Sequence, residues 1–271
     1  MTGVLSSVAV VGGCGGFGRL FAAHLQALSW TVTTIDIDPS ADVVCDLHNN
    51  PQPFVDALAQ PDLVLLCVPE DLALVALQVA DGHTRADQLI VDICSVKSRI
   101  CAAAEVACKP SQYVSVHPMF APERGFAGHN MVMIDVRGGP AGAELREVFR
   151  AWQLNLVEAN AATHDQVTSL VQVLAHATLI AFAEAESRMP VPRELVEAMA
   201  TPIYSALSAT AQGLLAENPQ LYHNIQTANP GGDTARQVLQ DAVRDTAQRL
   251  GQEDAQLVAE LFQRLRQPRE Q

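Results

Sequence analysis

The sequence is short of basic residues, of long apolar runs and of paired cysteines. Lys and Arg number 17 against 30 Asp and Glu, so the 271 residues carry a formal charge of −13. No nucleic-acid partner is expected for a chain this acidic, because neutralising phosphates requires clustered Lys and Arg. Hydrophobic residues still make up 49% of the chain, which excludes wholesale disorder.

Continuous apolar stretches are also missing. A membrane-spanning helix needs a run of about 18 apolar residues, and the sequence has none. Residues 1–11 lack the basic start of a signal peptide and lead directly into a strand pattern. The sequence therefore predicts no membrane partner and a cytoplasmic location.

The six cysteines form no Cys-x-x-Cys pair and all lie within the first 108 residues. Cys94, Cys101 and Cys108 recur every seven residues, a spacing that a metal cluster could use. Because the cysteines lie mostly in apolar segments, small buried side chains are the stronger interpretation, and no metal site is predicted.

The two halves of the chain differ in pattern. In the first half, short apolar or β-branched runs alternate with helical periodicity, which predicts an α/β domain with a mostly parallel sheet. The expected strands cover residues 8–11, 32–37, 63–68, 89–93, 114–116 and 131–136. From Asn160 onward the pattern is helical almost throughout. We therefore expect a parallel-sheet domain in residues 1–155 and an all-helical domain in residues 156–271.

One expected helix, covering residues 163–187, is apolar on nearly every side. Such a helix must be buried on every side, and a domain of about 110 residues rarely encloses one alone. We therefore expect a homodimer in which the C-terminal helices of each subunit pack around those of the other.

A glycine-rich turn follows the first strand and consists of Gly13, Cys14, Gly15, Gly16, Phe17 and Gly18. This Gly-x-Gly-x-x-Gly pattern lies between a strand and a helix, as a dinucleotide site of the Rossmann type requires. The first glycine permits the tight turn, the second lets the backbone approach the pyrophosphate, and the third lets the helix pack on the strand. The helix N-terminus then holds the phosphate charge. The alternative is an ordinary glycine-rich turn.

The second strand ends at Asp36, 18 residues after Gly18. A carboxylate at this place accepts hydrogen bonds from the adenosine ribose and repels a 2′-phosphate, and the sequence predicts NAD over NADP. The third strand ends in Cys67, Val68 and Pro69, which we expect to line the cofactor cleft.

Two more strand ends carry polar side chains, Ser95 with Lys97 on one and His117 on the other. Ligands of an open α/β sheet bind outside the carboxyl ends of the strands, so Ser95 and His117 are both expected at the cofactor cleft. Histidine accepts a proton near neutral pH, and a serine hydroxyl can fix its tautomer. Lys97 is either a charge in the site or a solvated turn residue.

Motifs along nearly the whole chain resemble the prephenate/arogenate dehydrogenase family, which includes the 4-amino-4-deoxyprephenate dehydrogenases. They are residues 11–18, Asp92 with 95–97, 117–120 with Pro122 and Gly125, 164–166, Gln172 with His176, 202–204 and 218–222. The resemblance implies an N-terminal NAD domain of the Rossmann type and a C-terminal helical dimerisation domain. It also implies NAD-dependent oxidative decarboxylation of prephenate, or of a close cyclohexadienyl analogue, to an aromatic product in tyrosine or related biosynthesis. In that reaction His117 accepts the proton of the ring hydroxyl and Ser95 orients His117.

Polar residues recur every four positions on the long helix: His164, Thr168, Gln172 and His176. They are either core polar groups satisfied within the dimer or a second wall of the active site. By family position, Gln172 and His176 are the expected substrate residues, with Lys97 and Arg124 as further candidates. His164 and Asp165 are expected nearer the start of the helix.

At two positions the chain departs from the prephenate-specific pattern, which carries arginine after Pro-Ile-Tyr and again eight residues later for the ring carboxylate. Here these positions are Ser205 and Gly213. Either another arginine substitutes (Arg124, Arg188 or Arg193), or the substrate is 4-amino-4-deoxyprephenate or arogenate, which carries its own cation. We therefore expect weak affinity for prephenate.

Two other classes of protein share the scaffold. A non-catalytic NAD-binding regulator would not need Ser95 and His117. Dehydrogenases of the β-hydroxyacid or imine-reducing type place a different catalytic pattern on the long helix. The residues favour the prephenate-type dehydrogenase over both.

Overall fold

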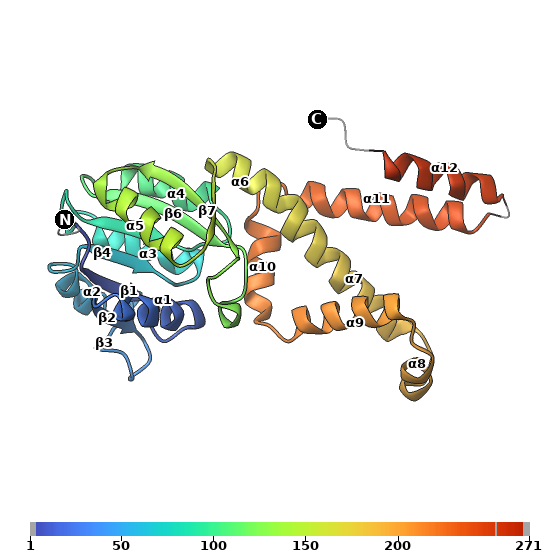
Figure 1. Cartoon of the computed structure of the whole chain (residues 1–271), viewed down its shortest axis with the longest axis horizontal. Coiled ribbons are helices and arrows are strands. Elements are labelled where there is room, and N and C mark those ends of the chain that lie inside the picture. Colours follow the sequence, from blue (N-terminus) through green and yellow to red (C-terminus); the bar gives the residue numbers. More distant parts are fainter. Residues whose placement is uncertain (1–3, 253, 268–271) are drawn as a thin grey trace. The chain divides into compact units, whose positions relative to one another are not determined.

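The computed structural model describes residues 4–252 and 254–267, which belong to two compact units, Met1–Val167 and Thr168–Gln271 (Figure 1). The first unit contains the sheet. In the described part of the second unit, every regular element is a helix.

The sheet of the first unit has eight strands in the order β3-β2-β1-β4-β5-β6-β7-β8. All neighbouring strands are parallel except β6 and β7, which are antiparallel. The strand order steps outward in both directions from β1 and β4, as in a doubly wound nucleotide-binding sheet. The strands are β1 (Ser7–Val11), β2 (Thr31–Asp36), β3 (Val43–Val44), β4 (Leu63–Leu66), β5 (Leu89–Asp92), β6 (Gln112–Pro118), β7 (Asn130–Arg137) and β8 (Asn155–Glu158).

Helices cover both faces of this sheet, because successive side chains of a strand point to opposite faces. Val10 of β1 packs in one apolar cluster with Phe21 of α1, whereas Val11 packs in the other with Leu77 of α3. Burial on both faces explains why the central strands are continuous apolar runs. The helices of this unit are α1 (Gly16–Ala27), α2 (Gln52–Ala57), α3 (Glu70–Ala80), α4 (Ser98–Val106), η1 (Pro122–Arg124), α5 (Pro140–Ala151) and α6 (Ala161–Thr168).

The predicted fold class is confirmed, and the six predicted strands correspond to β1, β2, β4, β5, β6 and β7. Two strands were not predicted. β3 has only two residues, and β8 lies at the sheet edge with both ends exposed, so neither has the buried apolar run that marks the central strands.

One continuous helix, Ala161–Arg188, starts as α6 in the first unit and continues into the second. Its middle, η2 (Ser169–Leu174), is π-helical, and α7 (Ala175–Arg188) completes it. The others are α8 (Arg193–Met199), α9 (Pro202–Leu215), α10 (Pro219–Ala228), α11 (Gly232–Leu250) and α12 (Ala255–Arg266).

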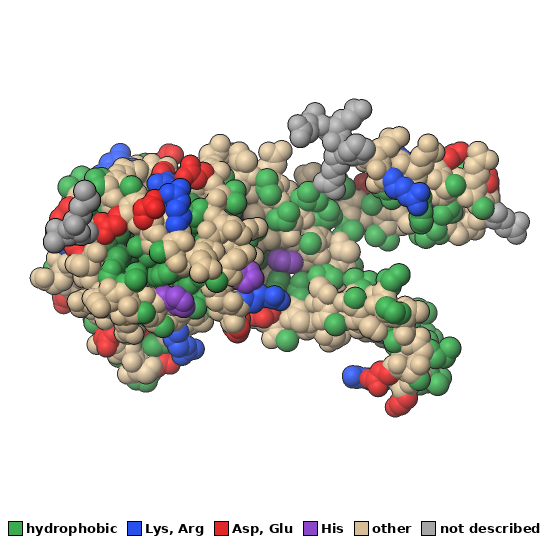
Figure 2. Space-filling model, viewed as in Figure 1, with side chains coloured by type: hydrophobic (Ala, Val, Ile, Leu, Met, Phe, Trp, Pro, Cys, Tyr) green, Lys and Arg blue, Asp and Glu red, His purple; other side chains and the backbone are tan. Residues whose placement is uncertain are grey.

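The helix Ala161–Arg188 exposes much of its apolar surface. Although no uninterrupted apolar run exists, this helix is long and apolar enough to cross a membrane by length and composition, and little of it is buried. Val167 is 52% exposed and Val171 is 47% exposed, and Figure 2 shows further hydrophobic side chains over the helices of the second unit. This chain alone therefore does not supply the burial that the sequence pattern demands.

The six cysteines are free thiols, and four of them are buried. Across residues 4–252 and 254–267, no His, Cys, Asp or Glu side chains are grouped so that three of them could hold a metal ion.

Candidate active site

The glycine turn between β1 and α1 is built from close backbone contacts. Gly12 has φ +77°, and a Cβ there would overlap the carbonyl of Cys67 at the end of β4. A Cβ at Gly18 would overlap the carbonyl of Gly12, so α1 can approach the turn only with glycine at this place. Gly13, the predicted turn glycine, also lies in the turn, and a Cβ there would overlap the Thr34 side chain, whereas the left-handed conformation belongs to Gly12 directly before it.

Asp36 ends β2 beside this turn. Its Oδ2 accepts a hydrogen bond of 2.9 Å from the backbone N–H of Cys14, and its Oδ1 accepts one of 3.2 Å from Asp38. A carboxylate has about four lone-pair sites, so the side chain can accept ribose hydroxyls as well.

A cavity of about 150 Å³ adjoins Asp36 and is lined by Val11, Gly12, Ile35, Ile37, Cys45, Asp46, Leu47, His48, Val68 and Leu72. Mostly apolar walls with two acids, Asp36 and Asp46, suit an adenosine moiety, and none of the lining residues is a Lys or Arg that would suit a 2′-phosphate. The residues present fit a dinucleotide of the NAD type.

The loop that follows β6 lies against the glycine turn. A Cβ at Gly16 would come within 2.8 Å of the Pro122 ring, and Phe120 makes an edge contact with Phe17 at 5.8 Å between centroids. The carboxyl end of β6, where His117 lies, is therefore joined to the dinucleotide turn. Arg124 lies in η1 of this loop with an exposed side chain, so it stays a candidate substrate residue.

His117 is 3% exposed, and its ring contacts a second histidine. Nδ1 of His117 lies 2.9 Å from Nε2 of His164, and Nδ1 of His164 lies 2.8 Å from Oδ1 of Asp165. His164 and Asp165 belong to α6, within the same compact unit as His117. The sequence had placed both merely near the start of the helix, and the structure brings them into the site.

The Asp165 carboxylate is held at the N-terminus of α4. It accepts hydrogen bonds of 2.9 Å from the backbone N–H groups of Lys97 and Ser98, and another from the Ser98 hydroxyl. Helix N-termini stabilise anions. Burial acts to raise the pKa of Asp165, but the hydrogen bonds from His164, Ser98 and Lys97 outweigh it and the pKa is lowered.

Burial controls the charge of His117. Removal from water, reinforced by Lys97 and His164, lowers the pKa of His117 well below 6.5. The imidazole is therefore neutral near pH 7 and has a lone pair with which to accept a proton.

Lys97 is completely buried, which excludes the solvated turn considered from the sequence. Its ammonium donates to Oδ1 of Asp92 at 2.9 Å and to the carbonyl of Val116 at 2.6 Å. The hydroxyl of Tyr113 donates to the other oxygen of Asp92 at 2.9 Å. Lys97 thus ties the end of β5 to β6 directly before His117, and a substrate contact would require it to leave these acceptors.

Ser95 is half-buried in the segment between β5 and α4. The contact found at Nδ1 of His117 is made by His164, whereas the sequence had assigned the orienting contact to Ser95. The role of Ser95 stays a prediction.

The predicted substrate residues of the long helix lie in the second unit. Gln172 is half-buried in the π-helical segment, whose longer turn interrupts the four-residue stripe, and π-helical turns are frequent at functional sites. The ring of His176 meets the ring of Tyr222 edge-on at 4.9 Å, and burial lowers the pKa of His176. Neither finding shows a contact with substrate, so the substrate-binding role of Gln172 and of His176 stays a prediction.

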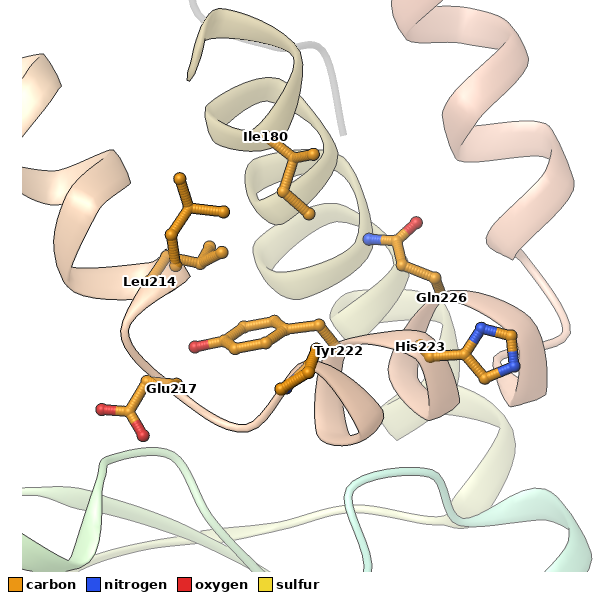
Figure 3. Close-up of a pocket in the computed structure, with 8 residues that line it drawn as sticks. Ile180, Leu214, Glu217, Tyr222, His223 and Gln226 are labelled. Atoms are coloured by element: carbon orange, nitrogen blue, oxygen red, sulfur yellow. The ribbon is translucent and has the colours of Figure 1, made fainter. Parts of the chain in front are cut away.

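A mostly apolar pocket of about 290 Å³ lies beside Tyr222 in the second unit (Figure 3). Its lining residues come from α7, from the end of α9, from the segment that follows it and from α10: Ile180, Leu214, Leu215, Glu217, Pro219, Tyr222, His223 and Gln226. The sequence did not predict this pocket, although Tyr222 belongs to the motif of residues 218–222. Gly213 directly precedes the lining residue Leu214, and no atom lies within 4 Å of a Cβ built on it.

A doubly wound sheet, a glycine turn with an acid at the next strand end, and a buried neutral histidine are typical of a nucleotide-binding dehydrogenase. The family model of the prephenate dehydrogenase nucleotide-binding domain matches residues 21–132, and that of the prephenate dehydrogenase dimerisation domain matches residues 160–266. The chain belongs to the prephenate dehydrogenase family, which confirms the resemblance of its motifs. The first match begins after the glycine turn, so the assignment of that turn depends on its geometry.

Individual relatives agree with this membership. The 4-amino-4-deoxyprephenate dehydrogenase of Streptomyces pristinaespiralis is 33% identical over 269 residues, 97% of this chain and 91% of that protein. The T-protein of Enterobacter agglomerans is 30% identical over 224 residues, 82% of this chain but 56% of that protein. The prephenate dehydrogenase of Aquifex aeolicus, solved with hydroxyphenyl propionate and NAD+, has the same fold, with a TM-score of 0.71 at 17% identity over 96% of each chain.

Proposed function

We propose that this oxidoreductase is an NAD-dependent, homodimeric enzyme of the cytoplasm that oxidatively decarboxylates 4-amino-4-deoxyprephenate. We infer the reaction type from His117, which is buried and neutral at the strand end next to the dinucleotide turn. A non-catalytic NAD-binding protein would have no use for such a base.

Asp36 supports NAD as the cofactor, because its carboxylate favours free ribose hydroxyls over a 2′-phosphate. When bound, NAD would supply the hydride acceptor for the ring carbon that bears the substituent. The close-packed glycine turn and Asp36, whose carboxylate also accepts from the Cys14 N–H, would hold that cofactor.

His117 is the proposed proton acceptor. A protonated amine has no lone pair to stabilise the carbon that loses hydride, so its proton must leave first. His117 accepts this proton as a neutral imidazole; the ring carboxylate then leaves as carbon dioxide, and the electrons of the broken bond complete the aromatic ring. General-base assistance of this kind contributes about 10²–10⁴-fold to rate.

The preference for an amino substrate is supported by Ser205 and Gly213, which stand where the prephenate-specific pattern has arginines. Hydrogen bonds to charged groups contribute about 1.5–3 kcal/mol each, so losing an arginine disfavours a substrate that depends on it. The amino substrate carries a cation of its own. The 33% identity to a 4-amino-4-deoxyprephenate dehydrogenase over nearly both full chains favours the same assignment.

Homodimer formation is supported by the match to the dimerisation domain and by the exposed apolar side chains of Ala161–Arg188. A second copy of the chain would cover this surface in water. Light scattering in buffer without detergent is expected to give the mass of a dimer. A well-folded monomer would contradict the proposal.

The reaction is tested by following NADH formation with prephenate, arogenate and 4-amino-4-deoxyprephenate in parallel, while carbon dioxide and the aromatic product are quantified. We expect one NADH and one carbon dioxide for each aromatic amine formed from 4-amino-4-deoxyprephenate. Absence of NADH formation with all three substrates would reject the assignment as a dehydrogenase of this substrate class.

A further inference from the structure

The geometry points to a proton relay in which Asp165 and His164 fix the tautomer of His117 and take over the positive charge that His117 acquires. His164 and Asp165 would then be positioning residues that act through His117. The inference rests on the proposed function of His117 as the base. Two short contacts, of 2.9 Å and 2.8 Å, join the three side chains.

The direction of the hydrogen bonds follows from Asp165. Its lowered pKa keeps the carboxylate ionised, and an ionised carboxylate can only accept hydrogen bonds. Nδ1 of His164 therefore carries the hydrogen, and Nε2 of the neutral ring carries the lone pair. That lone pair accepts from Nδ1–H of His117, which leaves the lone pair of His117 on Nε2.

The same chain of contacts can move charge. When Nε2 of His117 accepts a proton, the hydrogen on its Nδ1 can pass to Nε2 of His164. His117 then returns to a neutral ring and His164 becomes an imidazolium, whose Nδ1–H already donates to Asp165 at 2.8 Å. One proton enters at His117, and the positive charge comes to lie beside a carboxylate.

The surrounding charges explain why this transfer is useful. Lys97 disfavours a cation on His117, whereas Nδ1 of His164 lies 2.8 Å from the Asp165 carboxylate. Asp92 compensates Lys97 at 2.9 Å, and Glu70 is held by Arg99 at 3.1 Å. Among these groups, Asp165 is the carboxylate in direct contact with the histidine pair.

The tautomer can be measured without substrate or cofactor, so this test does not depend on the proposed activity. In protein labelled with ¹⁵N-histidine, we expect the neutral ring of His117 to carry its hydrogen on Nδ1. The signals are assigned with His117→Asn and His164→Asn, and His83→Asn at an exposed position serves as the control. A neutral His117 with its hydrogen on Nε2 would overturn the relay.

Asp165→Asn tests the charge that the relay depends on. Each Asp165 oxygen accepts from a backbone N–H, that of Lys97 or of Ser98, so the amide of the asparagine opposes one donor in either orientation and the negative charge is lost in both. We expect a fall in kcat on the order of 10²-fold, with a much smaller change in KM. Loss of the negative charge should also move the acid limb of kcat/KM to lower pH.

A purely structural role for Asp165 predicts a different result. In that case Asp165→Asn would lower the melting temperature and the amount of active enzyme, while kcat per active site and the midpoint of the acid limb stayed as in the parent. That outcome would overturn the relay even if the enzyme has the proposed activity.

Discussion

The ammonium of Lys97 lies 2.9 Å from Oδ1 of Asp92, and both side chains are completely buried. Removing one member of a buried ion pair leaves an uncompensated charge, which costs about 3–5 kcal/mol. We therefore expect Lys97→Met to reduce the free energy of unfolding by this amount in urea titrations. Arg193→Ala, which breaks the exposed pair with Glu197, is the control and should leave the urea midpoint unchanged. A Lys97→Met variant of normal stability with a raised substrate KM would instead make Lys97 a substrate residue.

Asp36 should determine cofactor choice. Asp36→Ser removes the ribose acceptor and also the bond to the Cys14 N–H, so NAD should bind about ten- to a hundredfold more weakly. Combining it with Ile37→Arg, at an exposed position, should relax or reverse the preference for NAD over NADP. Fluorescence titration with both cofactors measures the change. Equal use of NAD and NADP by the native protein would show that Asp36 does not read the ribose.

His117→Asn should keep the fold and NAD binding but lose about 10²–10⁴-fold in kcat, because a polar shape remains while the proton acceptor is gone. The pH dependence follows from the lowered pKa of His117. The neutral imidazole is the active form, so kcat/KM should be level around pH 7 and fall only as the pH drops well below 6.5. A rate that rises steeply through pH 7, or near-native turnover in the variant, would remove His117 from the proton transfer.

Gly213→Arg should restore affinity for prephenate. The site has room, since no atom lies within 4 Å of a Cβ at this position. One charge-assisted arginine–carboxylate contact is expected to lower the KM for prephenate about ten- to a hundredfold. Gly213→Gln, which adds length without charge, is the matched control. The same improvement in both variants would mean that bulk, not charge, limits prephenate binding.

Much of the fold could be predicted because its signals are local. The strands buried on both faces are continuous apolar runs, and the glycine turn with Asp36 places the nucleotide site at one edge of the sheet. Local patterns could not identify Gly12 as the left-handed residue, because the turn is set by the Cys67 carbonyl on a strand about fifty residues away.

The site was predicted less completely, since its key contacts join distant segments. The sequence identified His117 but not its partner His164, because 47 residues separate them. An acid directly after a histidine, as in His164-Asp165, was the available signal. The burial of Lys97 could not be predicted for the same reason, because it depends on Asp92, on Val116 and on the pairing of β5 with β6.

The proposed substrate preference is tested by a competition in which prephenate and 4-amino-4-deoxyprephenate are supplied together with NAD to one preparation. Quantifying the phenolic and the amino product at low conversion gives the ratio of the two kcat/KM values. We expect at least about a tenfold excess of the aromatic amine, because the loss of one charge-assisted contact weakens the use of prephenate by about that factor. A dominant phenolic product, with micromolar KM for prephenate and no turnover of the amino substrate, would contradict it.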